Sequence, residues 1–275
     1  MTLNTTDLTG RVVVITGAGS GIGRELAVHA ARRGATLSLC DRDEVGLQQS
    51  LDLVRGLGIK ADGQVVDVSD AEQMAMFGKT TIEQFGAPDL VINNAGIAVI
   101  GGIMDTTLAD WDRLLGINIL GVVHGINAFV PAMAERGSGH VVNVASAAGL
   151  LANPQLGAYS ASKHAVVGLS EALRIELAPH HIGVTAVCPG IINTAITKNS
   201  HYRGGDADAR KAKTATTYAR RGYTPERAAA NILKAVDRNR AVAPIAPEAH
   251  VMYVVSRIAP PVARWLSAGM ARIAQ

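Results

Sequence analysis

Short apolar runs alternate with longer helical stretches along this chain, and several runs are apolar at consecutive positions, such as Val12 to Ile15. A strand that is apolar on both faces must be covered on both faces, which favours a parallel sheet between two helix layers. Alternating strands and helices with right-handed crossovers predict an α/β, doubly wound fold. The patterns place strands at residues 11–16, 36–40, 63–67, 89–93, 140–145 and 184–188, and helices at 22–33, 44–57, 70–85, 108–133 and 159–177.

The first predicted strand runs directly into a glycine-rich loop, and a helical pattern follows at once. Glycines keep such a turn tight and let the backbone approach a pyrophosphate, while the helix N-terminus offers free N–H groups and a positive dipole potential. This context predicts a dinucleotide site of the Rossmann type, formed by Gly17, Gly19, Ser20, Gly21, Ile22 and Gly23.

Asp41 follows the second predicted strand, where a carboxylate can accept both hydroxyls of an adenosine ribose. It would repel a 2′-phosphate, so NAD is favoured over NADP. Arg42 could instead swing to meet a phosphate, but positions 18–20 of the glycine loop offer no second basic partner. Asp41 could also serve as a helix N-cap, alone or in addition.

Tyr159 and Lys163 are four residues apart, so on a helix they lie on one face, one turn from each other. A tyrosine is ordinarily a weak acid, but a nearby ammonium stabilises the phenolate. Such a phenol can exchange a proton with an alcohol or a carbonyl near neutral pH. The pair is therefore a candidate acid–base centre.

Taken together, the sequence motifs resemble the short-chain dehydrogenase/reductase family. The resemblance covers roughly residues 10–195 and rests on residues 16–23, Asn93-Asn94-Ala95-Gly96, Asn118, Ser146, Tyr159, Lys163 and Pro189-Gly190. It implies the sheet order 3-2-1-4-5-6-7 and, for the active protein, a homodimer or homotetramer assembled through the helices near 108–133 and 159–177.

The resemblance also implies a role for each matching residue. Tyr159 would be the general acid–base, Lys163 would hold the nicotinamide ribose, Ser146 would bind the substrate oxygen, and Asn118 would hold a water that relays protons to Lys163. Asn94, Ala95 and Gly96 would line the adenosine side, and Asp67 and Val68 would touch adenine. The remaining cofactor contacts would come from Pro189, Gly190, the backbone of Ile192 and the hydroxyl of Thr194.

The sequence around the presumed substrate pocket carries almost no charge, which suggests an apolar substrate contacted by Ser146, Ala148, Leu151, Leu156 and Tyr159. We expect one Rossmann-fold domain over residues 1–275, in which residues 192–224 form a mobile substrate lid. Residues 248–275 form an amphipathic C-terminal extension. Its apolar stripe is explained by closure over the substrate, packing on another subunit or contact with a membrane surface.

Composition excludes several other classes of protein. Charged residues make up only 18% of the chain and the net charge is +3, which argues against nucleic acid. No metal-ligand spacing is present. The two cysteines, Cys40 and Cys188, are expected to be buried free thiols in a reducing cytoplasm. Neither a signal peptide nor an uninterrupted apolar run of the ~20 residues that a membrane span needs is evident.

The main hypothesis is an NAD-dependent oxidoreductase that moves a hydride between the cofactor and a lipophilic secondary alcohol or ketone of steroid, retinoid or fatty type. One alternative is an NADPH-dependent 3-oxoacyl reductase whose basic stretch 201–240 meets an anionic carrier. The other is a non-catalytic NAD-binding sensor. We expect a cytoplasmic protein, with peripheral membrane association through the C-terminal helix as a variant of that location.

Overall fold

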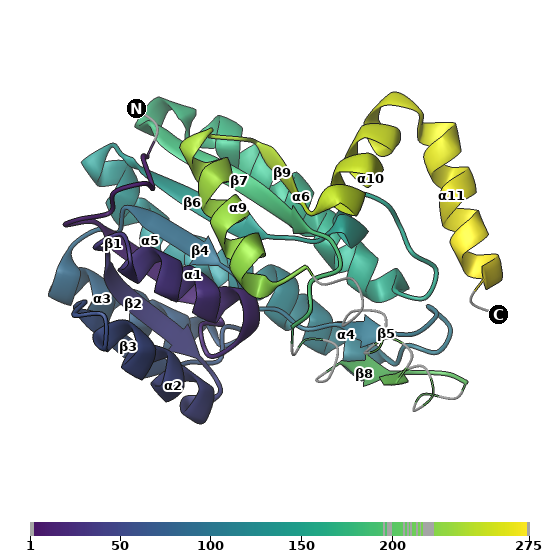
Figure 1. Cartoon of the computed structure of the whole chain (residues 1–275), viewed down its shortest axis with the longest axis horizontal. Helices are drawn as coiled ribbons and strands as arrows, with labels where there is room; N and C mark the ends of the chain where they lie inside the picture. The colour runs from purple at the N-terminus through teal and green to yellow at the C-terminus, as the bar shows by residue number, and fades with distance from the viewer. Residues whose placement is uncertain are drawn as a thin grey trace.

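Seven parallel strands form the central sheet of the protein (Figure 1). In the computed structural model, which describes residues 3–273 except 195, 197–199, 206, 208, 210, 213, 215 and 217–222, the sheet order is β3-β2-β1-β4-β6-β7-β9. Counted along the chain, this is the predicted order 3-2-1-4-5-6-7, which is thereby confirmed. The strands are β1 (Val12–Thr16), β2 (Thr36–Asp41), β3 (Ala61–Val65), β4 (Leu90–Asn93), β6 (Gly139–Val144), β7 (Ile182–Pro189) and β9 (Val242–Ile245).

Helices cover both faces of the sheet, as the consecutive apolar strand positions require. Val13 and Ile15 of β1 join one core cluster with helices α1 (Gly21–Ala31), α2 (Glu44–Arg55) and α9 (Pro225–Asp237). Val14 points to the other face, in a cluster with α3, α5 and α6. The helices of that second face are α3 (Ala71–Phe85), α4 (Leu108–Leu115), α5 (Gly121–Arg136) and α6 (Gly157–Glu176).

The predicted single helix at 108–133 consists of two α-helices joined by a π-helical turn over Gly116–Leu120. A π turn accommodates one extra residue within a continuous helix and frequently marks a functional position. By length and composition alone, the stretch Leu108–Arg136 is apolar enough to cross a membrane. In this fold it packs in the core, where Phe129 meets Phe77 of α3 edge to face at 5.6 Å between ring centroids.

Several elements carry no clear sequence pattern and were not predicted. Strand β9 has only four residues and contains Pro244, which an edge strand tolerates because one side needs no ladder donor. Helix α9 precedes it. A separate two-stranded sheet pairs β5 (Val99–Ile100) with β8 (His201–Tyr202), beyond the carboxyl end of the main sheet.

The C-terminal extension is a pair of helices, α10 (Pro247–Ile258) and α11 (Pro260–Ile273), that packs together and stands away from the sheet (Figure 1). Its large apolar side chains remain exposed in the single chain, with Trp265 73% and Ile258 78% exposed. In the described part of the last helix, Val262, Trp265 and Leu266 of the predicted apolar stripe are therefore not covered by this chain's own core.

Both cysteines are free and buried, Cys40 on β2 and Cys188 on β7. A second buried polar feature lies near the amino ends of β6 and β7. His140 Nε2 is 2.8 Å from the Thr185 hydroxyl, which itself donates to the carbonyl of Arg240 at 2.6 Å. The hydroxyl therefore accepts from the imidazole, which places the proton of His140 on Nε2.

His140 makes the fold sensitive to acid. Burial, with the positive charge of Arg174, lowers the pKa of His140 from 6.5 to about 3. Below its ordinary pKa the unfolded chain takes up a proton that the folded protein refuses, so the free energy of unfolding falls by about 1.4 kcal/mol per pH unit over that window. Urea unfolding at pH 6.5 and pH 5 should show that the free energy of unfolding falls less between these two pH values for His140→Gln than for the wild type. Equal losses would contradict this account, because all other titrating groups are common to both proteins.

Candidate active site

The glycine loop joins β1 to α1 and packs tightly on the end of β4. Gly17 and Gly21 have positive φ values of 66° and 55°, which favour glycine. A Cβ on Gly23 would collide with the carbonyl oxygen of Gly17, and one on Gly17 would lie 2.8 Å from the Cα of Ala95. Asn94 fastens the loop, because its Nδ2 donates to the carbonyl oxygens of Thr16 and Gly17 at 3.0 Å each.

The N-terminal end of α1 carries the positive pole of the helix dipole. Its N-cap Ser20 makes no side-chain capping bond, and the first turn contains no acidic residue. Thr194 lies beside this end, with its Cβ and Cγ2 3.4 Å from the position of a Cβ on Gly21. A helix N-terminus in this state suits an anion, so these residues fit the pyrophosphate of a dinucleotide.

Asp41 is held at the end of β2, facing the glycine loop. One carboxylate oxygen accepts from the Gly19 N–H at 2.8 Å and the other from the Asp43 N–H at 2.9 Å. The N-cap of α2 is Asp43, which corrects the alternative that Asp41 caps this helix. Arg42 is exposed next to it. The carboxylate is therefore fixed against the glycine loop, and its contact with a ribose stays a prediction.

The residues predicted to touch adenine follow β3. The Asp67 carboxylate accepts from the backbone N–H and the hydroxyl of Ser69, at 2.9 and 2.6 Å. Val68 is buried, and its carbonyl oxygen is 2.8 Å from Nδ1 of His124 on α5. His124 was missed by sequence reasoning, because a lone histidine inside an apolar helix gives no signal of this contact.

Tyr159 and Lys163 lie one turn apart on α6, as the spacing predicts. The Lys163 Nζ is 5.8 Å from the Tyr159 ring centroid and donates to the Val144 carbonyl oxygen at 2.9 Å. Lys163 is only 3% exposed. Burial penalises the charged ammonium and lowers the pKa of Lys163 to about 8.

Asn118 sits in the π turn and faces the same place. Its Oδ1 accepts from the Ile97 N–H at 2.9 Å, and its Nδ2 donates to the Ile97 carbonyl and to the Ser162 hydroxyl, both at 3.0 Å. A Cβ on Gly96 would lie 3.2 Å from Asn118 Oδ1 and 3.3 Å from Lys163 Nζ. The structure thus brings Asn118, Lys163 and Gly96 together, while the water relay stays a prediction.

Ser146 follows β6 and begins a short 3₁₀ helix, Ala147–Gly149, where its hydroxyl accepts from the Ala148 N–H at 3.1 Å. A Cβ on Gly149 would lie 2.6 Å from the carbonyl oxygen of Lys163, so this turn packs directly on α6. The predicted substrate residues flank it: Leu151 is buried, Leu156 precedes α6, and Ala148 is half-buried. Their contact with a substrate remains a prediction.

The end of β7 is fixed by groups that the sequence did not indicate. The Gly190 N–H donates to the carbonyl of Ile245 at 2.8 Å, and the Ile191 N–H donates to Glu248 Oε1 at 2.7 Å. Ile192 is buried in the core beneath them. Glu248 of α10 therefore holds the segment that begins the predicted lid.

Part of the predicted lid at 192–224 lies outside the described residues. Within it, Arg203 forms a two-pronged ion pair with Asp110, at 2.8 Å for both contacts, and Asp110 is 3% exposed. Asp110 also completes a capping box with Thr107 at the start of α4. Residues 201–203 are thereby tied to α4.

No group of three or more potential metal ligands occurs among the residues that the structure describes.

Comparison with known proteins agrees with this geometry. The short chain dehydrogenase family matches residues 11–203. The chain is 40% identical over 255 residues to the probable oxidoreductase EphD of Mycobacterium tuberculosis H37Rv, covering 90% of this chain but only 43% of EphD. It is 38% identical over 254 residues to the putative oxidoreductase SadH of the same strain, covering 90% of this chain and 91% of SadH.

A solved structure of a short chain dehydrogenase/reductase from Burkholderia phymatum in complex with NAD is similar to this chain, with 32% identity and a TM-score of 0.84. The similarity covers 91% of this chain and 94% of that one. The chain belongs to the short-chain dehydrogenase/reductase family.

Burial of Lys163 predicts a dependence of stability on alkaline pH. The pKa is about 8 in the folded protein against 10.5 ordinarily, so between these values the unfolded chain binds more protons and the free energy of unfolding rises with pH. Below pH 8 both states are charged and the burial cost is present in full.

Urea unfolding should be measured from pH 7.5 to 10. Over this range the free energy of unfolding of the wild type should rise by up to about 3 kcal/mol relative to that of Lys163→Met. The exposed Lys79 supplies a control, since Lys79→Met should follow the wild type. Parallel curves for the wild type and Lys163→Met would exclude this account.

Proposed function

We propose that this protein catalyses hydride transfer between NAD and a lipophilic secondary alcohol or ketone. The observation that carries the proposal is the convergence of Asn118 and Lys163 on Gly96, with Tyr159 one helical turn away and Ser146 packed against the same helix. All four side chains are of kinds suited to alcohol–carbonyl chemistry, which supports the proposal. EphD and SadH, which are similar to this chain, are both named as oxidoreductases.

NAD, when bound, supplies a nicotinamide ring that accepts or donates the hydride. The chain's own part is to hold and move the proton. Tyr159 donates its phenolic proton to a carbonyl oxygen during reduction, or takes the alcohol proton during oxidation. The Lys163 ammonium, anchored on the Val144 carbonyl, favours the phenolate by its charge. Ser146 holds the substrate oxygen within reach of the phenol.

Tyr159→Phe removes the proton donor and keeps the ring, so it tests this assignment directly. Turnover should fall by three orders of magnitude or so, because general acid–base catalysis contributes roughly 10²–10⁴-fold. NAD binding, measured by calorimetry, should stay within about threefold of the wild type. Phe129→Leu changes a buried core residue of α5 that is not among the predicted site residues. It serves as a control for effects that come from a loss of stability alone. Normal turnover by Tyr159→Phe would contradict this mechanism.

The fixed Asp41 carboxylate supports the preference for NAD. One of its oxygens accepts from the Gly19 N–H of the glycine loop and the other from the Asp43 N–H, and a 2′-phosphate beside this carboxylate would meet a negative charge. The similar Burkholderia phymatum protein was solved with NAD.

Replacing Asp41 by Ser should therefore weaken the preference for NADH over NADPH. The kcat/KM for NADH should fall and that for NADPH should rise, so that their ratio drops by at least about tenfold. Asp52→Ser, a change of the same charge on the exposed side of α2, should leave the ratio unaltered. A wild type that prefers NADPH would support the 3-oxoacyl reductase alternative and contradict our assignment.

The substrate class, the assembly and the location belong to the same proposal. Apolar Leu151 and Leu156 beside Ser146 support a lipophilic substrate, and the exposed apolar face of α10 and α11 supports a homo-oligomer or a peripheral membrane contact of a cytoplasmic enzyme. A screen of lipophilic alcohols and ketones with an NADH absorbance readout tests the class. NAD binding without turnover on any of them would favour the non-catalytic sensor.

A further inference from the structure

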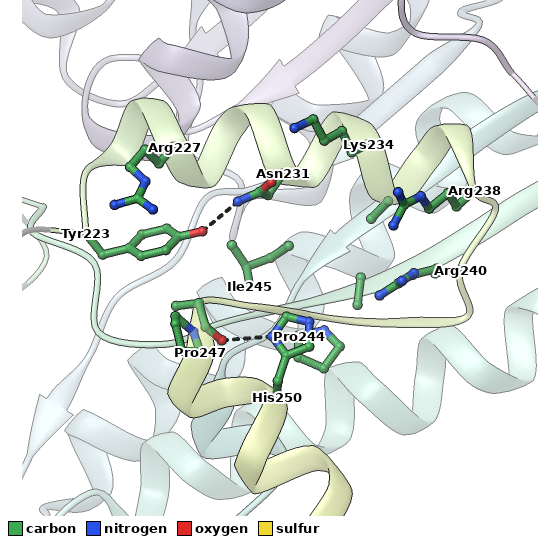
Figure 2. Close-up of a pocket in the computed structure, with 13 residues that line it drawn as sticks. Tyr223, Arg227, Asn231, Lys234, Arg238, Arg240, Pro244, Ile245, Pro247 and His250 are labelled. Carbon is green, nitrogen blue, oxygen red and sulfur yellow. Dashed lines mark hydrogen bonds between the residues drawn. The ribbon is translucent and has the colours of Figure 1, made fainter.

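A groove of about 340 Å³ lies along the outer edge of the sheet, between α9 and the segment that leads through β9 into α10 (Figure 2). None of its lining residues belongs to the predicted NAD or substrate contacts. The basic stretch at 201–240, which the proposed function leaves unexplained, contributes most of its charge.

The Arg and Lys side chains of the groove come from α9 and the residues that follow it. Arg227 and Lys234, seven positions apart, lie on one stripe of α9, and Arg238 is the C-cap residue of this helix. The opposite stripe of α9 is buried in the core. Arg240 and His250 flank the groove from the turn before β9 and from α10, as Figure 2 shows.

Among the described residues that line the groove, no Asp or Glu offsets this charge. Asp237 of α9 accepts from the Thr5 N–H, and Glu248 of α10 accepts from the Ile191 N–H. Within the described part of the chain, the groove's Arg and Lys side chains form no ion pair. Lys234 and Arg238 are four residues apart and carry like charge, so the two side chains repel each other.

One end of the groove is aromatic and apolar. The Tyr223 hydroxyl accepts from Asn231 Nδ2 at 2.7 Å, and the Arg227 guanidinium lies 4.9 Å from the Tyr223 ring centroid. Pro247 and Ile245 face this ring across the groove. The lining of the groove therefore combines an aromatic and apolar surface with a cationic one.

We propose that this groove binds a phosphorylated small molecule at a site separate from the NAD site. Its phosphate groups would lie among Lys234, Arg238 and Arg240, and its organic part against Tyr223. Pro244 removes a ladder donor from the strand at this edge, which disfavours continuation of the sheet into a second copy of the chain.

Pyrophosphate is the simplest probe, titrated calorimetrically into the full chain at saturating NAD so that the glycine loop is filled. The wild type should bind it, more weakly as salt is raised. Arg238→Ala with Arg240→Ala should weaken binding by roughly tenfold or more, and Lys234→Ala alone should weaken it in the same direction. All three positions are exposed, and an unchanged thermal midpoint checks that the variants fold.

The matched control is Lys79→Ala with Arg264→Ala, which removes the same charge from exposed positions outside the groove. Loss of binding in the groove variants alone supports the proposal, even if NAD itself fails to bind. The proposal is overturned if the wild type does not bind pyrophosphate, if both double variants lose affinity equally, or if pyrophosphate binding survives both. Binding to phosphatidylglycerol vesicles but not to pyrophosphate also overturns it, as does a groove variant that only changes the oligomeric mass.

Discussion

A buried ammonium group is costly in a folded protein, and the predicted active site of this fold is arranged around one. Lys163 is removed from water and keeps a carbonyl partner at the end of β6. A charge in such a place is tolerated only where polar groups surround it. The carboxyl end of a parallel sheet supplies them, because several strands end there side by side. Gly96 leaves room for the ammonium and the Asn118 amide to approach the same point.

Glycines also allow close backbone contacts between the loop after β1, helix α1 and the end of β4. Where Gly23 lies against Gly17 and Gly17 against Ala95, no side chain fits, so the loop stays close to the end of α1 that is predicted to bind phosphate. Asn94 ties this loop to β4, and β4 pairs with β6, which carries the lysine's acceptor. The predicted cofactor end and the predicted catalytic end are thus joined through one strand.

Much of this arrangement could be predicted from the sequence, because runs such as Val12 to Ile15 and the glycine loop report their surroundings directly. Six of the seven strands of the sheet overlap their predicted ranges. The seventh, β9, was missed because four residues with a proline carry no period. The π turn at Asn118 was missed because a continuous apolar helix pattern hides one extra residue. Pairings over long sequence separations, such as Arg203 with Asp110 and Glu248 with Ile191, leave no local signal at all.

The two thiols sit on opposite sides of the first strand in the sheet, Cys40 on β2 and Cys188 on β7, and in different core clusters. Burial raises the pKa of both, to about 12 for Cys188, so neither offers a thiolate in the closed molecule. An alkylating reagent can reach each sulfur only after its own neighbourhood opens. Each half of the sheet therefore contains one cysteine whose alkylation rate reports local opening. Unequal labelling rates would reveal which half opens more readily.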